Sequence, residues 1–410
     1  MNAGPRLFLK VTLPLAGMNF LNQASRTVMS IIGPVLAVEF ALSASELGLL
    51  AACMFASYAA AQLPVGVALD MLGTRRVQAA LGLVTAAGFA VFALSDGLAG
   101  FSLARVILGA GISAGLMAIL KANTQWFARA QVAGMTGLAM GVATLGSVLT
   151  TAPVEAALPS LGWRGVFWLL AGISVAVAAW IFASVRDKPG PAAHRTLKDE
   201  LAVMRQILAS PLFWRYGPAA AMLSILNFAY LGLWAGPWLR DVAGYDGPAR
   251  ARTLLFYTLA MTAGTLLSGQ ASSRVQAHGG SALLVPGICF TGLLAAQLGL
   301  MLQPAGAMVS ALWIMFAFFG AAGPTGYVAV GQMFPPEQMG RVSTAINTLT
   351  LGGAFLLQAA IGWILDLWPR AAGGGWDPGG YSAALFVSVA AQLVIAARLA
   401  ALRRRSSSRS

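Results

Sequence analysis

Residues 66–76 read GVALDMLGTRR: a glycine, an aspartate four residues on, a second glycine three residues further, and then two arginines. The stretch separates two apolar segments, near residues 45–69 and 77–95. Its glycines permit a tight turn, because a residue without a Cβ atom adopts backbone angles that other residues avoid. Asp70 can pair with basic side chains or with a helix N-terminus, where negative charge is favoured. The stretch therefore predicts a short, charged connection between two apolar helices.

The composition around this stretch excludes a water-soluble enzyme. Of 410 residues, 58% are hydrophobic and only 10% are charged, and the mean hydropathy is +0.76. Soluble domains carry about a quarter of their residues as charged side chains, so these charges are too few to cover a soluble body of this size. The 47 glycines suit membrane helices, in which small residues let backbones approach closely. We therefore expect an all-α membrane protein.

Apolar segments of the length that a bilayer requires, about 20 residues per helix, recur along the chain. We expect twelve transmembrane helices, near residues 11–37, 45–69, 77–95, 99–122, 134–157, 164–184, 214–238, 251–271, 282–303, 307–332, 342–367 and 381–401. They form two six-helix bundles, over residues 1–184 and 214–410, and the second bundle includes a basic C-terminal tail. The intervening linker, residues 185–213, is polar, and its part from Thr196 predicts a short amphipathic helix.

The net charge of +13 reflects membrane orientation and not nucleic-acid binding, because only Arg26, Arg105 and Lys121 of the 26 basic residues fall inside apolar spans. One side of the predicted topology, which includes the linker and both termini, holds 18 basic residues. The other side holds five, namely Arg164, Arg240, Arg250, Arg252 and Arg370. Basic residues are in excess in cytoplasmic loops. We therefore expect a multi-pass plasma-membrane protein, of the bacterial inner-membrane type, with both termini in the cytoplasm.

The two halves repeat one another. WFARAQVAGMTGLAMG (126–141) precedes the fifth span, and MFPPEQMGRVSTAIN (333–347) precedes the eleventh. Gly66 and Gly269 begin corresponding loops after the second and eighth spans. Two six-span repeats in the same orientation are typical of a transporter whose halves are related by an axis along the membrane normal.

GVALDMLGTRR resembles the signature loop of the major facilitator superfamily. Two further stretches support the resemblance, RVILGAGISAG (105–115) in the fourth span and GWRGVF (162–167) after the fifth. The second copy of the loop, GQASSRVQAHGG (269–280), is degraded, with Ser273 in place of the aspartate. The resemblance implies a transporter that alternates between inward- and outward-open states, and a latch that closes one face. Its residues are predicted to be Gly66, Asp70, Gly73, Arg75, Arg76 and Arg105.

The fifth span argues against the drug antiporters of this superfamily. Those proteins usually carry a Gly-Pro pair in a glycine-rich fifth span. Here the span reads GLAMGVATLGSVLTTAPVEAA, in which Pro153 comes late and follows an alanine. The chain is more similar to carriers of organic anions and monocarboxylates.

Arg26, near the centre of the first span, is the main candidate for binding substrate. Asn19, Asn22 and Arg26 follow helical spacings of three and four, so they share one face. Intramembrane charge is costly and marks functional sites by default. The planar guanidinium group suits a carboxylate or similar oxyanion, although it can also serve structurally by binding helix carbonyls. Organic-anion carriers of the superfamily often carry an arginine in the first helix, which strengthens the prediction of an anion site.

Other spans supply neutral polar and aromatic candidates for the same site. They are Tyr58 and Gln62 in the second span, Asn227, Tyr230 and Trp234 in the seventh, Tyr257 in the eighth, and Asn347 and Gln358 in the eleventh. Ordinary contacts between helices explain such residues equally well. Lys121 lies sixteen residues after Arg105, almost opposite to it around a helix, so the two cannot both line one cavity. Lys121 is a further candidate for substrate contact, or it can extend to the interface.

These observations predict a monomeric transporter of a small, anionic organic metabolite, with no cofactor and no enzymatic site. The alternatives are an efflux carrier for hydrophobic or weakly polar compounds, and a membrane receptor that transports nothing. An ATP-binding loop of the Gly-x-x-x-x-Gly-Lys type is absent from the sequence. No acidic residue lies near the centre of a predicted span, which leaves uniport, anion exchange and symport without a dedicated buried carboxylate.

Overall fold

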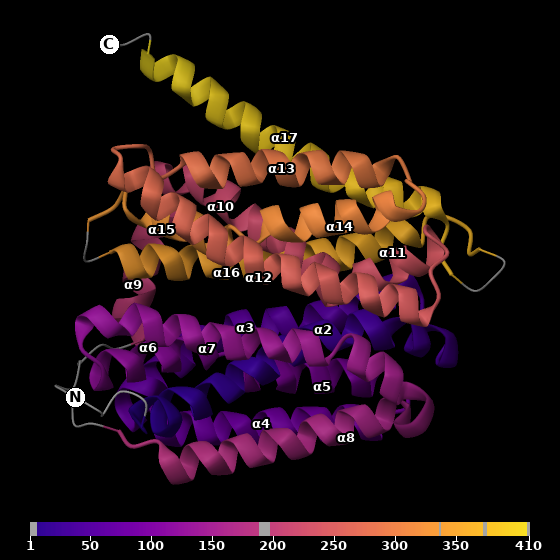
Figure 1. The fold of residues 1–410 in the computed structure, drawn as a ribbon, viewed down its shortest axis with the longest axis horizontal. Helices are drawn as coiled ribbons and strands as arrows, with labels where there is room; N and C mark the ends of the chain where they lie inside the picture. The colour runs from indigo at the N-terminus through magenta and orange to yellow at the C-terminus, as the bar shows by residue number, and fades with distance from the viewer. Residues whose placement is uncertain (1–5, 188–196, 336–337, 372–374, 408–410) are drawn as a thin grey trace. The chain divides into compact units, whose positions relative to one another are not determined.

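The computed structural model describes residues 6–187, 197–335, 338–371 and 375–407. Within these ranges the chain is helical apart from its short connections, and β pairing is limited to one isolated bridge, between Arg370 and Trp376 (Figure 1). Packing divides the chain into two compact units. Unit 1 comprises Met1–Leu42 and Leu49–Glu200, and unit 2 comprises Ser43–Gly48 and Leu201–Ser410.

The described part of unit 1 is built from long helices and one short π-helix. In chain order these are η1 (Phe8–Thr12), α2 (Leu13–Glu39), α3 (Ala44–Leu72), α4 (Thr74–Leu94), α5 (Leu98–Gly111), α6 (Gly115–Trp126), α7 (Arg129–Leu149) and α8 (Ala152–Ser184). The first turn of α3 is the part that belongs to unit 2.

Helix α9 (Leu197–Ala209) confirms the helix that was predicted in the linker, and residues 188–196 lie outside the described ranges. Unit 2 continues with α10 (Pro211–Ala229), the π-helix η2 (Tyr230–Trp234), α11 (Ala235–Asp241), α12 (Gly247–Ala277), α13 (Leu284–Met301), α14 (Ala307–Gly320), α15 (Gly323–Gly331), α16 (Met339–Leu365) and α17 (Pro378–Ser407).

The all-α fold class is confirmed. Nine helical segments in the described ranges are long and apolar enough to cross a membrane, and some of them combine consecutive helices such as α5 and α6. They correspond to nine of the twelve predicted spans. The first, fifth and eighth predicted spans coincide with α2, α7 and α12, which fall outside this set; α7 contains a shorter apolar helix, Gly134–Leu149. Polar residues such as Asn19, Asn22 and Arg26 interrupt the apolar character of α2.

The predicted end of the fifth span was wrong. It was placed at residue 157, but α7 ends at Leu149 and α8 begins at Ala152. Pro153 lies in the first turn of α8 and favours a helix start there, because the amide hydrogen that it lacks would have no partner within the helix. The helical path of α8 also breaks at Gly162, whose φ of 64° is readily adopted only without a Cβ atom.

Two spans that correspond in the repeat are interrupted at corresponding places. The fourth span breaks between α5 and α6 at residues 112–114, and the tenth breaks between α14 and α15 at residues 321–322. Pro324 begins α15 and favours a new helix start there. The shared interruption agrees with the repeat seen in the sequence.

Glycines bring helices of each unit into backbone contact. An added Cβ atom at Gly109 would lie within 2.2 Å of the Met54 carbonyl oxygen, and at Gly264 it would lie 2.1 Å from that of Phe318. Gly146 on α7 packs equally closely against the carbonyl oxygen of Phe20 on α2. Small residues permit such approaches between membrane helices. The contact at Gly146 places α7 beside the polar face of α2.

Candidate functional site

The Arg26 side chain lies between two aromatic rings inside unit 1. It is only 8% exposed, in the middle of α2. Its guanidinium carbon lies 5.3 Å from the ring centre of Phe55 and 5.1 Å from that of Tyr58, both on α3. Both distances fall within the ~6 Å over which a ring face attracts a cation. The structure therefore brings the predicted residues Arg26 and Tyr58 into contact. It also places Phe55 against Arg26, and the spacing of three residues between Phe55 and Tyr58 was the sequence feature that could have predicted this.

The two asparagines of α2 continue this buried face. Asn22 Nδ2 donates to Asn19 Oδ1 at 3.4 Å, and Asn19 Nδ2 lies 3.7 Å from the sulfur of Met140 on α7. Gln62, four residues after Tyr58 on α3, is buried as well. We refer to Arg26, Phe55, Tyr58, Asn19 and Asn22 as the Arg26 group. Side-chain amides on α2 and α3 thus provide neutral hydrogen-bond donors and acceptors along the same buried face.

Arg105 lies next to the Arg26 group, and its predicted part in the latch stays a prediction. Its side chain is 1% exposed, and Nη1 donates to the Ser25 carbonyl oxygen at 2.8 Å. Ser25 directly precedes Arg26 in α2, so the two arginines belong to the same region of unit 1. Two buried cations in one region create a positive potential that favours an anion.

Lys121 contacts the signature loop. Its ammonium group donates to Asp70 Oδ1 at 2.8 Å and to the Leu69 carbonyl oxygen at 2.5 Å. Both side chains are partly exposed, 24% for Lys121 and 44% for Asp70. The interruption between α5 and α6 separates Lys121 from Arg105, and the two meet different neighbours. The structure thus groups Lys121 with Asp70, whereas the sequence placed it among the substrate residues.

The rest of the loop is fixed by Asp187, which the sequence analysis did not single out. Gly73 has a φ of 85°, and an added Cβ atom there would overlap the Asp187 carboxylate. Asp187 accepts hydrogen bonds from the backbone amides of Thr74 at 2.7 Å and Arg75 at 3.1 Å. It therefore caps α4, where negative charge is favoured. The sequence feature that could have identified Asp187 is its position as the first acidic residue of the predicted linker.

The arginines of the loop differ in their surroundings. Arg75 Nε donates to the Phe182 carbonyl oxygen at 2.7 Å, and its guanidinium carbon lies 4.3 Å from the Phe182 ring centre. Arg76 is exposed, and Gly66 has only the sulfur of Met117 near the position of an added Cβ atom, at 4.0 Å. Arg75 therefore joins the loop to the end of α8.

In unit 2 the predicted polar and aromatic residues form a closely packed cluster. Tyr257 donates to Asn227 Oδ1 at 2.5 Å, and Asn227 Nδ2 donates to the Ala317 carbonyl oxygen at 3.4 Å. The Tyr230 ring centre lies 5.5 Å from that of Trp313 and 5.2 Å from that of Phe316. All of these side chains are buried. Such rings in edge and tilted contact stabilise a helix bundle.

Trp234 and Gln358 connect the seventh and eleventh spans. The Trp234 indole donates to the Gln358 carbonyl oxygen at 3.1 Å, and Gln358 Nε2 donates to that of Phe228 at 3.3 Å. Both side chains are fully buried. Asn347, on the same helix as Gln358, is half-buried. These hydrogen bonds give Trp234 and Gln358 a role in joining the two helices, and substrate contact by them stays a prediction.

Asp366 caps the first turn of α3 within unit 2. Its carboxylate accepts hydrogen bonds from the backbone amides of Ala44 at 2.9 Å and Ser45 at 2.8 Å. Burial alone would raise the pKa of Asp366. The hydrogen bonds from Ser45, Ala44 and Ser43 outweigh burial and hold the pKa below its ordinary value of 3.8.

This lowered pKa predicts a pH-dependent stability. The contribution of Asp366 is fully present above the ordinary value of 3.8 and is lost as the pH falls through the lower value of the folded protein. We expect Asp366→Asn to lower the melting temperature at pH 7, and the difference from the wild type to shrink below pH 3.8. Melting curves of both proteins over this range measure it. A difference that stays constant with pH would contradict the carboxylate's role as a cap.

The described residues show no grouping of three or more His, Cys, Asp or Glu side chains that could hold a metal ion. The two cysteines, Cys53 and Cys289, are free.

Comparisons with known proteins agree with this architecture. The family described as "Major Facilitator Superfamily" matches residues 15–358. The chain is 30% identical over 351 residues to the transcription regulatory protein OpdE of Pseudomonas aeruginosa, covering 80% of this chain and 77% of the relative. It is 24% identical over 290 residues to the probable sulfoacetate transporter SauU of Cupriavidus necator, covering 67% of each. Over 201 residues it is 26% identical to the hexuronate transporter of Bacillus subtilis, covering 48% of this chain and 47% of the relative.

A solved structure shows the same fold. The bacterial homologue of the human lysosomal transporter Spinster, in an inward-facing and unoccupied conformation, matches with a TM-score of 0.80 at 18% identity and covers 97% of both chains. Because the family match spans most of the sequence and includes the signature loop and the Arg26 group, the chain belongs to the major facilitator superfamily.

Proposed function

We propose that this protein carries a small organic anion across the membrane by alternating access, and that Arg26 binds the anion. The observation that carries the proposal is the burial of the Arg26 guanidinium group between Phe55 and Tyr58. A charge at this depth is costly, so its retention favours a functional role. Sulfoacetate and hexuronates, for which two relatives are named, are anions of the size that one guanidinium group can hold.

The geometry suits a carboxylate or sulfonate. A guanidinium group forms two parallel hydrogen bonds to such an oxyanion, and these are stronger than bonds between neutral groups. The flanking rings exclude water from the cation, and Arg105 adds positive potential behind the Ser25 carbonyl. Asn19 and Asn22 supply neutral hydrogen-bonding groups for hydroxyls or a second oxygen. The efflux of hydrophobic compounds has weaker support, because the relatives named as transporters carry the anions sulfoacetate and hexuronate.

Binding of matched ligand pairs to the purified protein tests this proposal. A ligand that binds only the folded state raises stability by RT ln(1 + [L]/Kd), about 2.7 kcal/mol at one hundred times Kd. Galacturonate and galactose form one pair that differs chiefly in the carboxylate, and sulfoacetate adds a sulfonate. We expect at least one of the two anions to raise the melting temperature and galactose to leave it unchanged. Stabilisation by hydrophobic compounds alone would favour the efflux carrier instead.

The remaining features of the proposal follow from the family and the charge distribution. The protein functions as a monomer without a cofactor or catalytic activity, in a bacterial inner membrane, with both termini in the cytoplasm. Residues 1–184 and 214–410 act as the two moving bundles, and residues 185–213 link them. The name of the Pseudomonas aeruginosa relative favours a second candidate, a membrane receptor that regulates without transport.

The Asp70–Lys121 pair is proposed as part of a latch at the signature loop. Asp70→Asn removes the ion pair but leaves the bond from Lys121 to the Leu69 carbonyl oxygen. Because the pair is partly exposed, we expect a change in stability of at most about 1 kcal/mol. The transport rate should fall, because coupling of this kind is typically worth about 1–3 kcal/mol. The measurement is transport together with the accessibility of introduced cysteines on each face, and unchanged values of both would show that the loop is only a connector.

A further inference from the structure

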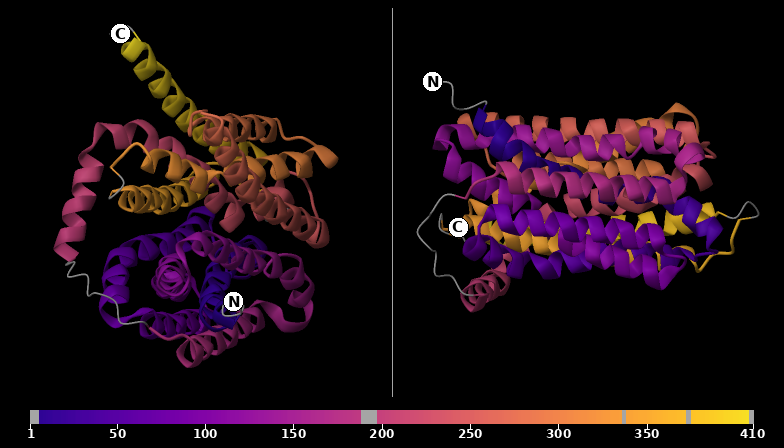
Figure 2. Two further views of the ribbon diagram at one scale, coloured as in Figure 1. Left: turned by 60° about the vertical axis from the view of Figure 1, so that its left-hand side comes forward. Right: turned by 90° about the horizontal axis from the view of Figure 1, so that it is seen from below.

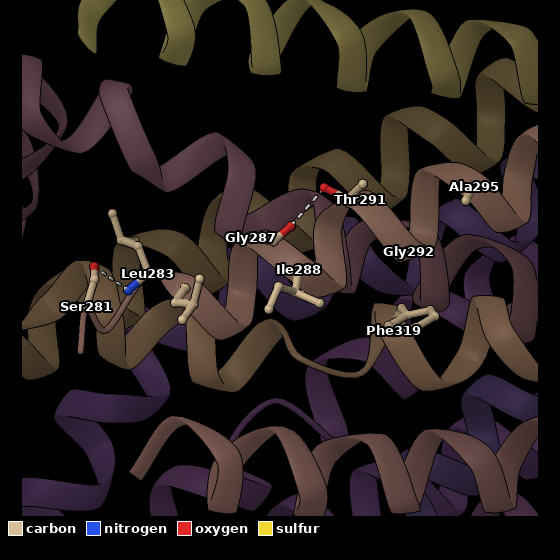
Figure 3. A pocket seen from close by; sticks show the side chains of 9 residues that line it. Ser281, Leu283, Gly287, Ile288, Thr291, Gly292, Ala295 and Phe319 are labelled. Atoms are coloured by element: carbon tan, nitrogen blue, oxygen red, sulfur yellow. Dashed lines mark hydrogen bonds between the residues drawn. The ribbon is translucent and has the colours of Figure 1, made fainter. Parts of the chain in front are cut away.

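Unit 2 has two hollows along the first half of α13, which share Leu283 and Gly287. One lies beside Phe319 of α14 and is an open depression (Figure 3). The other, of about 300 Å³, is a groove among α10, α13, α15 and α17. Pockets of about 300–1,000 Å³ commonly hold ligands. We refer to this second hollow as the α13–α17 groove.

The lining of the α13–α17 groove is apolar except for one phenol. Tyr216 and Leu223 come from α10, Pro286 and Phe290 from α13, and Leu399 from α17. Helix α17 packs against α10 and α13, and its last turns then diverge from the rest of unit 2 (Figures 1 and 2). Tyr216 and Pro286 lie near the starts of α10 and α13, Val330 lies near the end of α15, and the lining residues of α17, from Ala396 to Ala400, precede its last turns. The groove therefore runs inward from one end of the helices, where a membrane helix meets the head-group region.

A cation lies at this end of the groove. The guanidinium carbon of Arg215 is 5.2 Å from the ring centre of Tyr216, which lines the groove. The Arg215 Nε atom is buried and has no hydrogen-bond partner in the described part of the chain. Arg398 is exposed on α17, next to the lining residue Leu399. The sequence then continues into Arg403, Arg404 and Arg405. In the described part of the chain, Arg215 and Arg398 thus lie beside lining residues of the apolar slot.

We propose that the α13–α17 groove binds an anionic phospholipid, with an acyl chain in the slot and the phosphate at Arg215. An acyl chain matches the apolar lining, and a phosphate provides the acceptor that the buried Nε atom lacks. Basic pockets between transmembrane helices on the cytoplasmic side bind acidic head groups in this way. The choice of the cytoplasmic leaflet rests on the topology proposed above, whereas the binding itself does not depend on it. The site is separate from the Arg26 group, which belongs to unit 1.

Native mass spectrometry of the full-length protein in detergent tests the proposal. Phosphatidylglycerol and phosphatidylcholine, with identical acyl chains, are titrated separately, and inorganic phosphate serves as the head group alone. We expect one tightly retained phosphatidylglycerol and weaker retention of phosphatidylcholine. Arg215→Gln should weaken the retention of phosphatidylglycerol about fivefold, since one arginine near the surface contributes about 1 kcal/mol. Arg274→Gln, which removes an exposed arginine of α12 outside the groove, should not change it.

A second variant fills the slot without disturbing the fold. An added Cβ atom at Gly287 meets no other atom within 4 Å, so Gly287→Leu should fold and occupy the groove. We expect it to lose the tightly bound lipid, while Gly172→Leu, at an equally open helical glycine of unit 1, retains it. Equal retention of the two lipids by the wild type, or unchanged retention in both Arg215→Gln and Gly287→Leu, would overturn the proposal. Binding of inorganic phosphate as tightly as of the lipid would also overturn it, because the slot would then contribute nothing.

Discussion

Arg26→Ala is expected to weaken binding of the transported anion by at least about a hundredfold. Hydrogen bonds to charged groups contribute about 1.5–3 kcal/mol each, and the guanidinium group offers two to one oxyanion. The burial of Arg26 between Phe55 and Tyr58 keeps water from replacing them. Arg26→Lys keeps the charge but loses the planar fork, so its defect should be intermediate for a carboxylate.

The measurement is ligand binding to purified variants whose folding has first been checked by melting temperature. Neutral analogues should bind the wild type and Arg26→Ala about equally. Arg274→Ala is a matched control, because it removes an exposed arginine from the other unit. If Arg26→Ala folds and binds the anion with wild-type affinity, Arg26 has a structural role and the anion site lies elsewhere.

The second large effect is expected at Gly146, where α7 meets α2. An added Cβ atom at Gly146 would lie 2.1 Å from the Phe20 carbonyl oxygen, and backbone cannot move aside as a side chain can. Gly146→Leu should therefore force the two helices apart and destabilise the protein by about 1–3 kcal/mol or more. Because Phe20 follows Asn19, the displacement should also weaken anion binding.

Gly141, on the same helix, provides the matched control for this prediction. An added Cβ atom there meets no other atom within 4 Å, so Gly141→Leu should leave both the melting temperature and anion binding close to the wild type. Thermal unfolding in detergent and ligand titration measure the two properties. Equal melting temperatures for Gly146→Leu and Gly141→Leu would show that α2 and α7 are not in close contact.

The fold was predictable because apolar runs of bilayer length dominate the sequence. Breaks within spans were harder to locate. The end of α7 was missed because residues 150–157 carry a single charge, that of Glu155, and Pro153 is the residue that marks the new start. Hydropathy records the cost of burial but not the backbone hydrogen bonds that proline removes.

The candidate site was predictable within one helix and less so between helices. Helical spacing placed Asn19, Asn22 and Arg26 on one face of α2, and the structure shows them buried together. The same spacing cannot predict which side chains of other helices a face will contact. Lys121 of α6 forms an ion pair with Asp70 of α3, and Tyr257 of α12 donates a hydrogen bond to Asn227 of α10. Such partners depend on tertiary packing, which the period of one helix does not contain.

Uptake into proteoliposomes that contain only this protein tests the central claim most directly. A labelled anion that raises the melting temperature is added outside, and its uptake is compared with that of its neutral analogue and with empty liposomes. The proposed function predicts saturable uptake of the anion by the wild type, greatly reduced uptake by Arg26→Ala, and no uptake of the neutral analogue. Binding of the anion by the folded protein without any uptake or exchange would contradict the claim and favour a membrane receptor.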